Sequence, residues 1–112
     1  MVKVKILIID DEIDYCLLMK GYFLSKNYEV FMAHNLKDGL MALEKERPDD
    51  LFLDNNLPDG EGWQLTDQLL TQYPNLNIHL ISSYKQTYSH NNKPNVKIWE
   101  KPISLDALNQ IF

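Results

Sequence analysis

Short apolar runs alternate along the chain with segments in which apolar residues recur at helical spacing. The run from Val2 to Ile9 is nearly continuous in branched apolar residues, which is typical of a strand covered on both faces of a sheet. Further runs of strand length lie at residues 28–32, 51–53, 78–81 and 96–99. Because helical segments separate these runs, the pattern predicts βα units that build a parallel sheet.

The helical segments carry their apolar residues on one side. The first predicted helix has one buried stripe, made by Tyr15, Leu18, Met19, Tyr22 and Phe23. Asn35 is the predicted N-cap of the second helix and Pro48 its stop. The inward residues of this second helix are predicted to be Leu36, Leu40 and Leu43. A turn at residues 57–60 precedes a third helix, and Ser104 caps a last short helix that carries Leu105, Leu108 and Phe112 inward.

Composition narrows the class of protein. The chain has 112 residues, which suits one compact domain over residues 1–112, and 45% of them are hydrophobic. Eleven basic residues against sixteen acidic ones give a formal charge of −5, which argues against a nucleic-acid-binding face. No apolar run approaches the roughly 20 residues that span a bilayer, and no signal peptide is expected. The single cysteine, Cys16, fits a reducing compartment, so we expect a cytoplasmic protein without membrane contact.

Polar side chains collect where the predicted strands end. They are Asp10 and Asp11 after the first strand, Asp54 after the third, Ser82 and Ser83 after the fourth, and Lys101 after the fifth. Sites in parallel α/β sheets form at these carboxyl ends, so we expect the side chains to meet. Clustered carboxylates repel one another unless a cation neutralises them, and oxygen ligands suit Mg²⁺. An aspartate oxygen can attack phosphorus, while a metal, a lysine and a hydroxyl stabilise the transferred group.

Each of these residues also has a simple structural interpretation. Asp10 or Asp11 alone is a suitable acid for the first turn of a helix. Ser82 alone is an ordinary hydroxyl at a strand end, and Lys101 alone is an ordinary surface lysine. The combination and its order along the chain favour the phosphoryl-transfer interpretation.

Four stretches together resemble the response regulator receiver domain family. They are residues 6–12, residues 54–62, residues 81–83 and the Lys101-Pro102 pair. The resemblance covers the chain except for residues 84–95. It implies a flavodoxin-like α/β fold, a doubly wound five-stranded parallel sheet in the order 2-1-3-4-5 with helices on both faces. It also implies a phosphorylation-dependent switch of a two-component phosphorelay, which catalyses only its own phosphorylation and dephosphorylation.

The resemblance implies a role for each matching residue. Asp54 is the expected phosphoacceptor. The expected Mg²⁺ ligands are Asp10, Asp11, Asp54 and the main-chain carbonyl of Asn56. Ser82 and Lys101 are expected to bind the phosphoryl group, and the Lys101–Pro102 peptide is expected to be cis. Asn56 and Tyr84 are expected to modulate dephosphorylation. The implied partner is a sensor histidine kinase or a histidine phosphotransfer protein, and the resemblance is compatible with a dimer and with an output domain beyond residue 112.

Two departures and two alternatives remain. Ile98 stands three residues before Lys101, where receivers usually carry an aromatic switch residue. Residues 84–94 are polar and lack an apolar stripe, so we expect at most a short or irregular helix there. A phosphatase of the haloacid-dehalogenase type uses similar residues, but its second aspartate follows two residues after the nucleophile, whereas Asp10 and Asp11 are adjacent. A receiver-like adaptor that is never phosphorylated is the other alternative.

Overall fold

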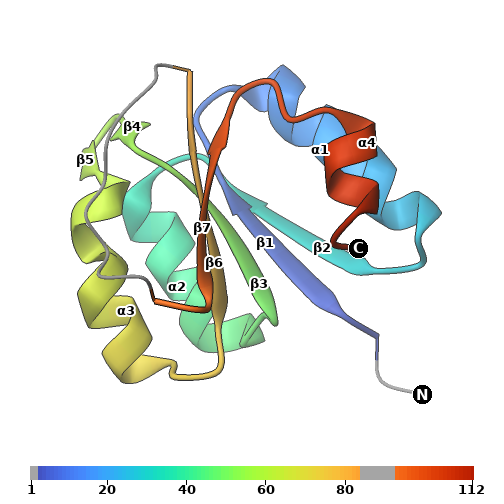
Figure 1. The fold of residues 1–112 in the computed structure, drawn as a ribbon. Helices are drawn as coiled ribbons and strands as arrows, with labels where there is room; N and C mark the ends of the chain where they lie inside the picture. The colour runs from blue at the N-terminus through green and yellow to red at the C-terminus, as the bar shows by residue number, and fades with distance from the viewer. Residues whose placement is uncertain (1–2, 84–92) are drawn as a thin grey trace.

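The computed structural model describes residues 3–83 and 93–112, which form a three-layer α/β fold (Figure 1). The central sheet contains β1 (Lys5–Ile9), β2 (Glu29–Ala33), β3 (Asp50–Asp54), β6 (Asn77–Ser82) and β7 (Val96–Glu100). Its strands lie in the order β2-β1-β3-β6-β7, and every neighbouring pair is parallel. Numbered within this sheet alone, the order is 2-1-3-4-5, so the predicted fold class is confirmed.

Helices cover both faces of the sheet. In Figure 1, α1 (Ile13–Ser25) and α4 (Leu105–Asn109) lie on one face, and α2 (Leu36–Glu46) and α3 (Thr66–Gln72) lie on the other. A 3₁₀ turn, η1 (Gly62–Leu65), leads into α3. A small hairpin of β4 (Asn56–Leu57) and β5 (Gly60–Glu61) follows β3 at the carboxyl end of the sheet. The predicted turn at residues 57–60 is the turn of this hairpin.

The central strands supply two apolar clusters, one for each face of the sheet. In β1, Ile6 and Ile8 belong to the cluster under α1 and α4, while Leu7 and Ile9 belong to the cluster under α2 and α3. This alternation follows from the two-residue period of a strand. Full burial of such side chains stabilises the fold by about 1.5–3 kcal/mol each, so the register of β1 is strongly specified.

The predicted helix faces are partly wrong. Leu18 is 62% exposed, and the buried residues of α1 are Cys16, Met19 and Phe23. In α2 the buried positions are Gly39 and Leu43, whereas Leu40 is exposed. Gly39 lets α2 approach β1 closely, because an added Cβ would lie 2.8 Å from Ile9 Cγ1. With Gly39 facing the sheet, the next residue, Leu40, faces outward. Leu105 is exposed as well, and Leu108 is the buried residue of α4.

The predicted caps are confirmed. Asn35 Oδ1 accepts a hydrogen bond from Asp38 N at 2.8 Å, and Ser104 Oγ accepts one from Ala107 N at 3.0 Å. Such caps satisfy N–H groups that the first helical turn leaves without a partner. The expectation for residues 84–94 falls mostly outside the described residues. Within the described ranges, no helix is both long enough and apolar enough to cross a membrane.

Candidate functional site

Three aspartates meet at the carboxyl end of the sheet. Asp10 and Asp11 follow β1, and Asp54 is the last residue of β3, the neighbour of β1. Each offers one carboxylate oxygen, and these oxygens lie within 4.8 Å of one another. Asp10 and Asp54 are buried, whereas Asp11 is exposed. The structure therefore brings these predicted site residues together in a cluster, called the acidic pocket below, of which Asp11 is the exposed member.

Asp10 is held on every side by its neighbours. Its N–H donates to Ala33 O at 3.0 Å. Its carbonyl accepts from His34 Nδ1 at 2.9 Å and from Cys16 Sγ at 3.3 Å. Its Oδ1 accepts from Glu12 N at 2.9 Å. These contacts fix the direction in which the carboxylate points, so the pocket is preorganised.

Lys101 is the cation of the pocket. Its Nζ lies 2.6 Å from Asp10 Oδ2, 2.8 Å from Glu12 Oε1 and 3.5 Å from Asp54 Oδ1. Its backbone N–H donates to Ser82 O at 2.8 Å, which joins the carboxyl ends of β6 and β7. The peptide bond from Lys101 to Pro102 is cis. The lysine therefore reaches the acidic pocket from the far side of Asp54.

The charges of this pocket do not balance. Burial raises the pKa of Asp54 to about 6, and the negative charge of Asp10 adds to the effect. Burial also raises the pKa of Asp10, although the hydrogen bond from Lys101 opposes this shift. For Lys101, burial favours a lower pKa, but hydrogen bonds with Asp10 and Glu12 outweigh it and raise the pKa. The single ammonium of Lys101 thus offsets only part of the negative charge of the clustered carboxylates.

The donor set fits a divalent cation. Asp10 Oδ2 lies 2.6 Å from Lys101 Nζ and has no further hydrogen-bond donor among the described residues. An oxygen-only cluster with one exposed member suits Mg²⁺, which binds one or two carboxylates and retains water or phosphate oxygens. The residues present would therefore hold Mg²⁺ without rearrangement of the fold.

Ser82 and Asn56 lie at neighbouring strand ends. Ser82 is the buried last residue of β6 and follows Ile81, the residue that pairs with Asp54. Asn56 is exposed at the start of the hairpin, two residues after Asp54. Both residues thus lie at the same carboxyl edge of the sheet as Asp54, and their roles stay predictions. Tyr84, the other predicted modulator, lies outside the described residues.

The loop after Asp54 is closed by hydrogen bonds to Asn55. Asn55 O accepts from Gly62 N at 3.0 Å, and Asn55 Oδ1 accepts from Trp63 N at 3.2 Å. Gly62 is required by this close approach, because an added Cβ would collide with Asp54 O and would lie 2.8 Å from Leu53 Cδ1. These hydrogen bonds therefore hold the β4–β5 hairpin next to Asp54, the candidate phosphoacceptor.

The hairpin is also fastened to α2 by a residue that sequence reasoning treated only as part of a turn. Asp59 Oδ1 accepts from Leu36 N at 2.7 Å, and Asp59 Oδ2 accepts from Lys37 N at 3.0 Å. These two hydrogen bonds lower the pKa of Asp59. Glu12, His34 and Cys16 are further neighbours of the site that the sequence left without a role. Only Glu12 had a local signal, since it directly follows Asp10 and Asp11.

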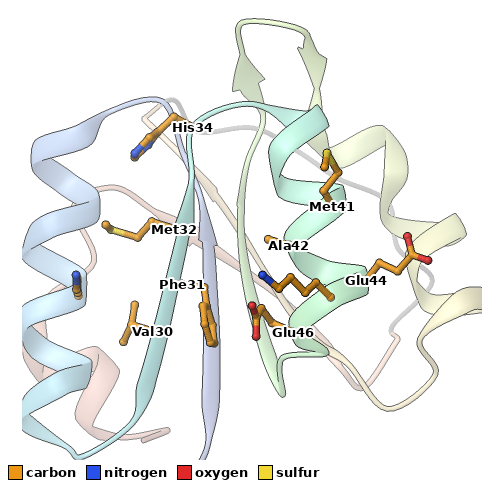
Figure 2. Close-up of a pocket in the computed structure, with 10 residues that line it drawn as sticks. Val30, Phe31, Met32, His34, Met41, Ala42, Glu44 and Glu46 are labelled. Carbon is orange, nitrogen blue, oxygen red and sulfur yellow. The ribbon is translucent and has the colours of Figure 1, made fainter.

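A shallow groove of about 730 Å³ lies beside the site along β2 (Figure 2). Figure 2 shows His34 at the end of β2, with Met32 and Val30 farther along the strand and Met41 projecting from α2. Neither Asp10, Asp11 nor Asp54 lines this groove. The groove is therefore separate from the acidic pocket, and His34 is the residue between them.

Comparison with known proteins identifies the class. The family model of the response regulator receiver domain matches residues 6–111. The chain therefore belongs to this family of two-component signalling domains, and the haloacid-dehalogenase interpretation is wrong. Receiver domains are signalling domains and generally bind Mg²⁺ at an acidic pocket, which corresponds to the aspartate cluster described above.

Individual relatives agree with this assignment. Sporulation initiation phosphotransferase F of Bacillus subtilis is 30% identical over 84 residues, which cover 75% of this chain and 68% of the relative. Transcriptional regulatory protein ZraR of Klebsiella oxytoca is 31% identical over 85 residues, which cover 73% of this chain and 18% of that protein. The structure of a CheY-like response regulator receiver domain protein from Methanospirillum hungatei superposes with a TM-score of 0.86. It is 27% identical, and the alignment covers 98% of this chain and 91% of that one.

Proposed function

We propose that Asp54 accepts a phosphoryl group from a phosphohistidine, so that the chain acts as a phosphorylation-dependent switch of a two-component phosphorelay. The observation that carries this proposal is the position of buried Asp54, 3.5 Å from Lys101 Nζ and within 4.8 Å of the Asp10 and Asp11 oxygens. An Asp54 carboxylate oxygen forms the new bond to phosphorus while the bond from phosphorus to the histidine nitrogen breaks. The leaving imidazole keeps the electron pair of that bond.

The surrounding residues have distinct parts in this proposal. Asp10, Asp11, Asp54 and the Asn56 carbonyl would hold Mg²⁺. When bound, Mg²⁺ supplies positive charge that offsets the clustered carboxylates and the phosphoryl oxygens. Lys101 exchanges part of its contact with Asp10 for a phosphoryl oxygen, and the Ser82 hydroxyl donates to another. Engagement of Ser82 at the end of β6 then transmits the change to the output surface.

Intact-mass measurement with acetyl phosphate tests the proposal. With Mg²⁺ the domain should gain one phosphoryl group, and chelation of the metal should prevent the gain. Asp54→Asn should remove the adduct, whereas Asp14→Asn, a change at an exposed acid of α1, should leave it. An adduct that persists in Asp54→Asn would exclude Asp54 as the acceptor. A wild-type chain that gains nothing would favour the adaptor that is never phosphorylated.

We also propose that the phosphodonor protein docks on an exposed stripe of α1. The stripe consists of Ile13, Leu17 and Leu24, each more than half exposed, with Gly21 between them. Nothing lies within 4 Å of the position of a Cβ at Gly21, so a partner helix can approach closely there. The helix begins directly after Glu12, which places the stripe beside the acidic pocket. Exposed apolar side chains at this spacing suit a helical histidine donor.

Phosphotransfer kinetics separate docking from chemistry. Leu17→Ala should slow transfer from a phosphorylated histidine phosphotransfer protein by about tenfold, the loss expected from about 1.4 kcal/mol of apolar contact. Its rate with acetyl phosphate should not change. Met41→Ala, at an exposed position of α2, serves as the matched control and should affect neither rate. Equal losses with both donors would place Leu17 in the chemistry and not in docking.

The remaining proposals concern lifetime and context. Asn56 and Tyr84 would modulate hydrolysis of the aspartyl phosphate, and Tyr84→Ala should shorten its lifetime if the ring screens it from water. An unchanged lifetime would argue against this role.

We place the domain in the cytoplasm, supported by its single buried cysteine. We also propose an output domain beyond residue 112. The supporting observation is that the region matching this chain makes up only 18% of ZraR.

A further inference from the structure

A buried polar relay lies on the face of the sheet that α1 and α4 cover. Its centre is His79 in the middle of β6, which is only 2% exposed. His79 Nε2 lies 3.0 Å from Asp50 Oδ1, and Trp99 Nε1 donates to His79 Nδ1 at 3.0 Å. We call Asp50, His79 and Trp99 the core relay. The proposed phosphoryl-transfer chemistry uses none of these three residues directly.

The partners fix the protonation of the ring. An indole N–H can only donate, so His79 Nδ1 must accept and carries no hydrogen. The hydrogen of the neutral imidazole is therefore on Nε2, where it is donated to Asp50. Both ring nitrogens are satisfied, and the imidazole has one defined orientation. A second proton on Nδ1 would point at the indole N–H and break the contact with Trp99.

The surroundings hold the ring in place. The imidazole stacks on Phe52 with centroids 4.4 Å apart and an interplanar angle of 11°, and the Phe112 centroid lies 5.5 Å away. A cavity of about 280 Å³ borders the relay, and besides Asp50 and His79 its titratable lining residues are Tyr28 and Lys97. Asp50 is thus the only carboxylate among the described residues that line it. The relay is thus a hydrogen-bonded network within an otherwise apolar cluster, and both ring nitrogens of His79 have partners in it.

The relay crosses three of the strands whose carboxyl ends form the phosphoryl site, and the fourth is β1. Asp50 lies on β3, which ends in Asp54, and His79 lies on β6, which ends in Ser82. Trp99 lies on β7, opposite Ile81 and two residues before Lys101. Among the described strands, β7 pairs only with β6. The end of this edge strand is therefore held from one side only, by the ladder with β6 and by the hydrogen bond from Lys101 N to Ser82 O.

We propose that His79 is a positioning residue of the phosphoryl site, which sets the place of Lys101 by fixing Trp99 against β6 and β3. The proposal rests on the function proposed above, because Lys101 matters as the partner of the phosphoryl group. Ile98, next to Trp99, is exposed and cannot anchor β7 from its own side. The core relay thus adds a side-chain anchor to the backbone ladder between β6 and β7, and Trp99 acts as a fixed element and not a moving one.

Variants that remove single parts of the relay test this role. Trp99→Phe removes the N–H donor together with part of the ring, and His79→Leu removes both ring contacts. At saturating Mg²⁺, each should slow phosphorylation by acetyl phosphate by about tenfold, since a misplacement of about 1 Å can cost up to a hundredfold. Mg²⁺ affinity should change much less than the rate, because the proposed carboxylate ligands lie at the ends of β1 and β3, outside the relay. The single variant Asp50→Asn should keep a near-normal rate, since its amide oxygen still accepts from Nε2–H. Asp50→Leu, which has no acceptor, should slow the reaction.

Tyr22→Phe is the matched control. It removes a hydrogen bond of 2.6 Å to Asn109 Oδ1 on the same face, between α1 and the end of α4, and should leave the rate unchanged. Nitrogen-15 NMR should find the His79 hydrogen on Nε2 and should show shifted backbone amide signals of Lys101 and Ser82 in the relay variants. A folded His79→Leu with a wild-type rate and unshifted signals would overturn the proposal. If the wild-type chain accepts no phosphoryl group, the proposed function fails, and the amide signals alone decide whether the relay positions Lys101.

Discussion

Asp50 and Asp54 stand at the two ends of β3, both buried and both on the same face, but their surroundings differ. Asp50 has a neutral imidazole as its partner, and that imidazole has a further partner in Trp99. Asp54 instead lies beside Asp10 and Asp11 and shares one lysine with Asp10. The same residue type therefore stabilises one end of the strand and stores electrostatic repulsion at the other.

The comparison shows how a small sheet separates rigidity from reactivity. The core relay leaves no polar group of His79 without a partner, so it favours one arrangement of three strands. The acidic pocket has a surplus of negative charge, so it gains most from a cation and a phosphoryl group. A reactive carboxylate can be held at a strand end because the same strand is fixed at its other end.

The largest expected effect comes from removing the hydrogen-bond partner of Asp50, at the first end of β3. His79→Leu should destabilise the domain by about 3 kcal/mol, because it leaves the Asp50 carboxylate buried without a partner. The double variant Asp50→Leu with His79→Leu should recover most of this loss, since two apolar residues leave no orphaned charge. Urea unfolding of the two single variants and the double variant measures the coupling. Additive losses would show that the two side chains do not act as a pair.

The second effect is the stabilisation of the fold by Mg²⁺, which is proposed to bind at the Asp54 end of β3. Mg²⁺ should stabilise the wild-type domain by about 2.7 kcal/mol at one hundred times its dissociation constant, because it binds the folded chain preferentially. Asp54→Asn should reduce this gain, whereas Asp50→Asn should keep it, since Asp50 is no part of the pocket. Thermal unfolding with and without millimolar Mg²⁺ measures both. An unmoved wild-type melting temperature would contradict the proposed metal site.

The smallest effect is the pH dependence of the metal-free domain. Burial raises the pKa of folded Asp54 to about 6 from 3.8, so the folded state binds this proton more tightly than the unfolded state. The contribution of Asp54 to stability is therefore complete below about pH 4 and is lost as the pH rises through 6. At pH 7.5, Asp54→Asn should be more stable than wild type by roughly 2–3 kcal/mol in the presence of chelator.

The same comparison of Asp54→Asn with wild type, made at pH 4, is the control for this prediction. The advantage of Asp54→Asn should shrink at pH 4, where the wild-type carboxyl is protonated as well. Other groups of the pocket, including Asp10, titrate in both proteins and largely cancel in the difference. An advantage of the same size at both pH values would show that charge is not its cause.

The sequence predicted the sheet and its reactive end because both depend on local signals. Apolar runs identified each strand, and Asp54 or Ser82 at the end of a run located the pocket. Helix faces were harder, because leucine favours a helix without stating which side is buried. Leu18, Leu40 and Leu105 are exposed, while Cys16 and Gly39 pack inside.

The core relay could not be predicted from any local pattern. Asp50 adjoins a strand and His79 is an isolated histidine, so neither signals a partner. Their contact spans 29 positions of the chain and depends on the register of β3 with β6. Trp99 joins them only because β7 places its indole on the same face. Such networks become visible only when side chains from several strands are placed together.

The buried thiol of Cys16 has a practical consequence for site-directed labelling. Its S–H donates to Asp10 O, and burial, with the charge of Asp10 adding to it, raises the pKa of the thiol to about 12. Almost no thiolate exists near neutral pH, so maleimide reagents should pass over this native cysteine. A cysteine introduced at exposed Leu105 would then react alone, and a fluorophore or spin label could be attached to α4 without removing Cys16.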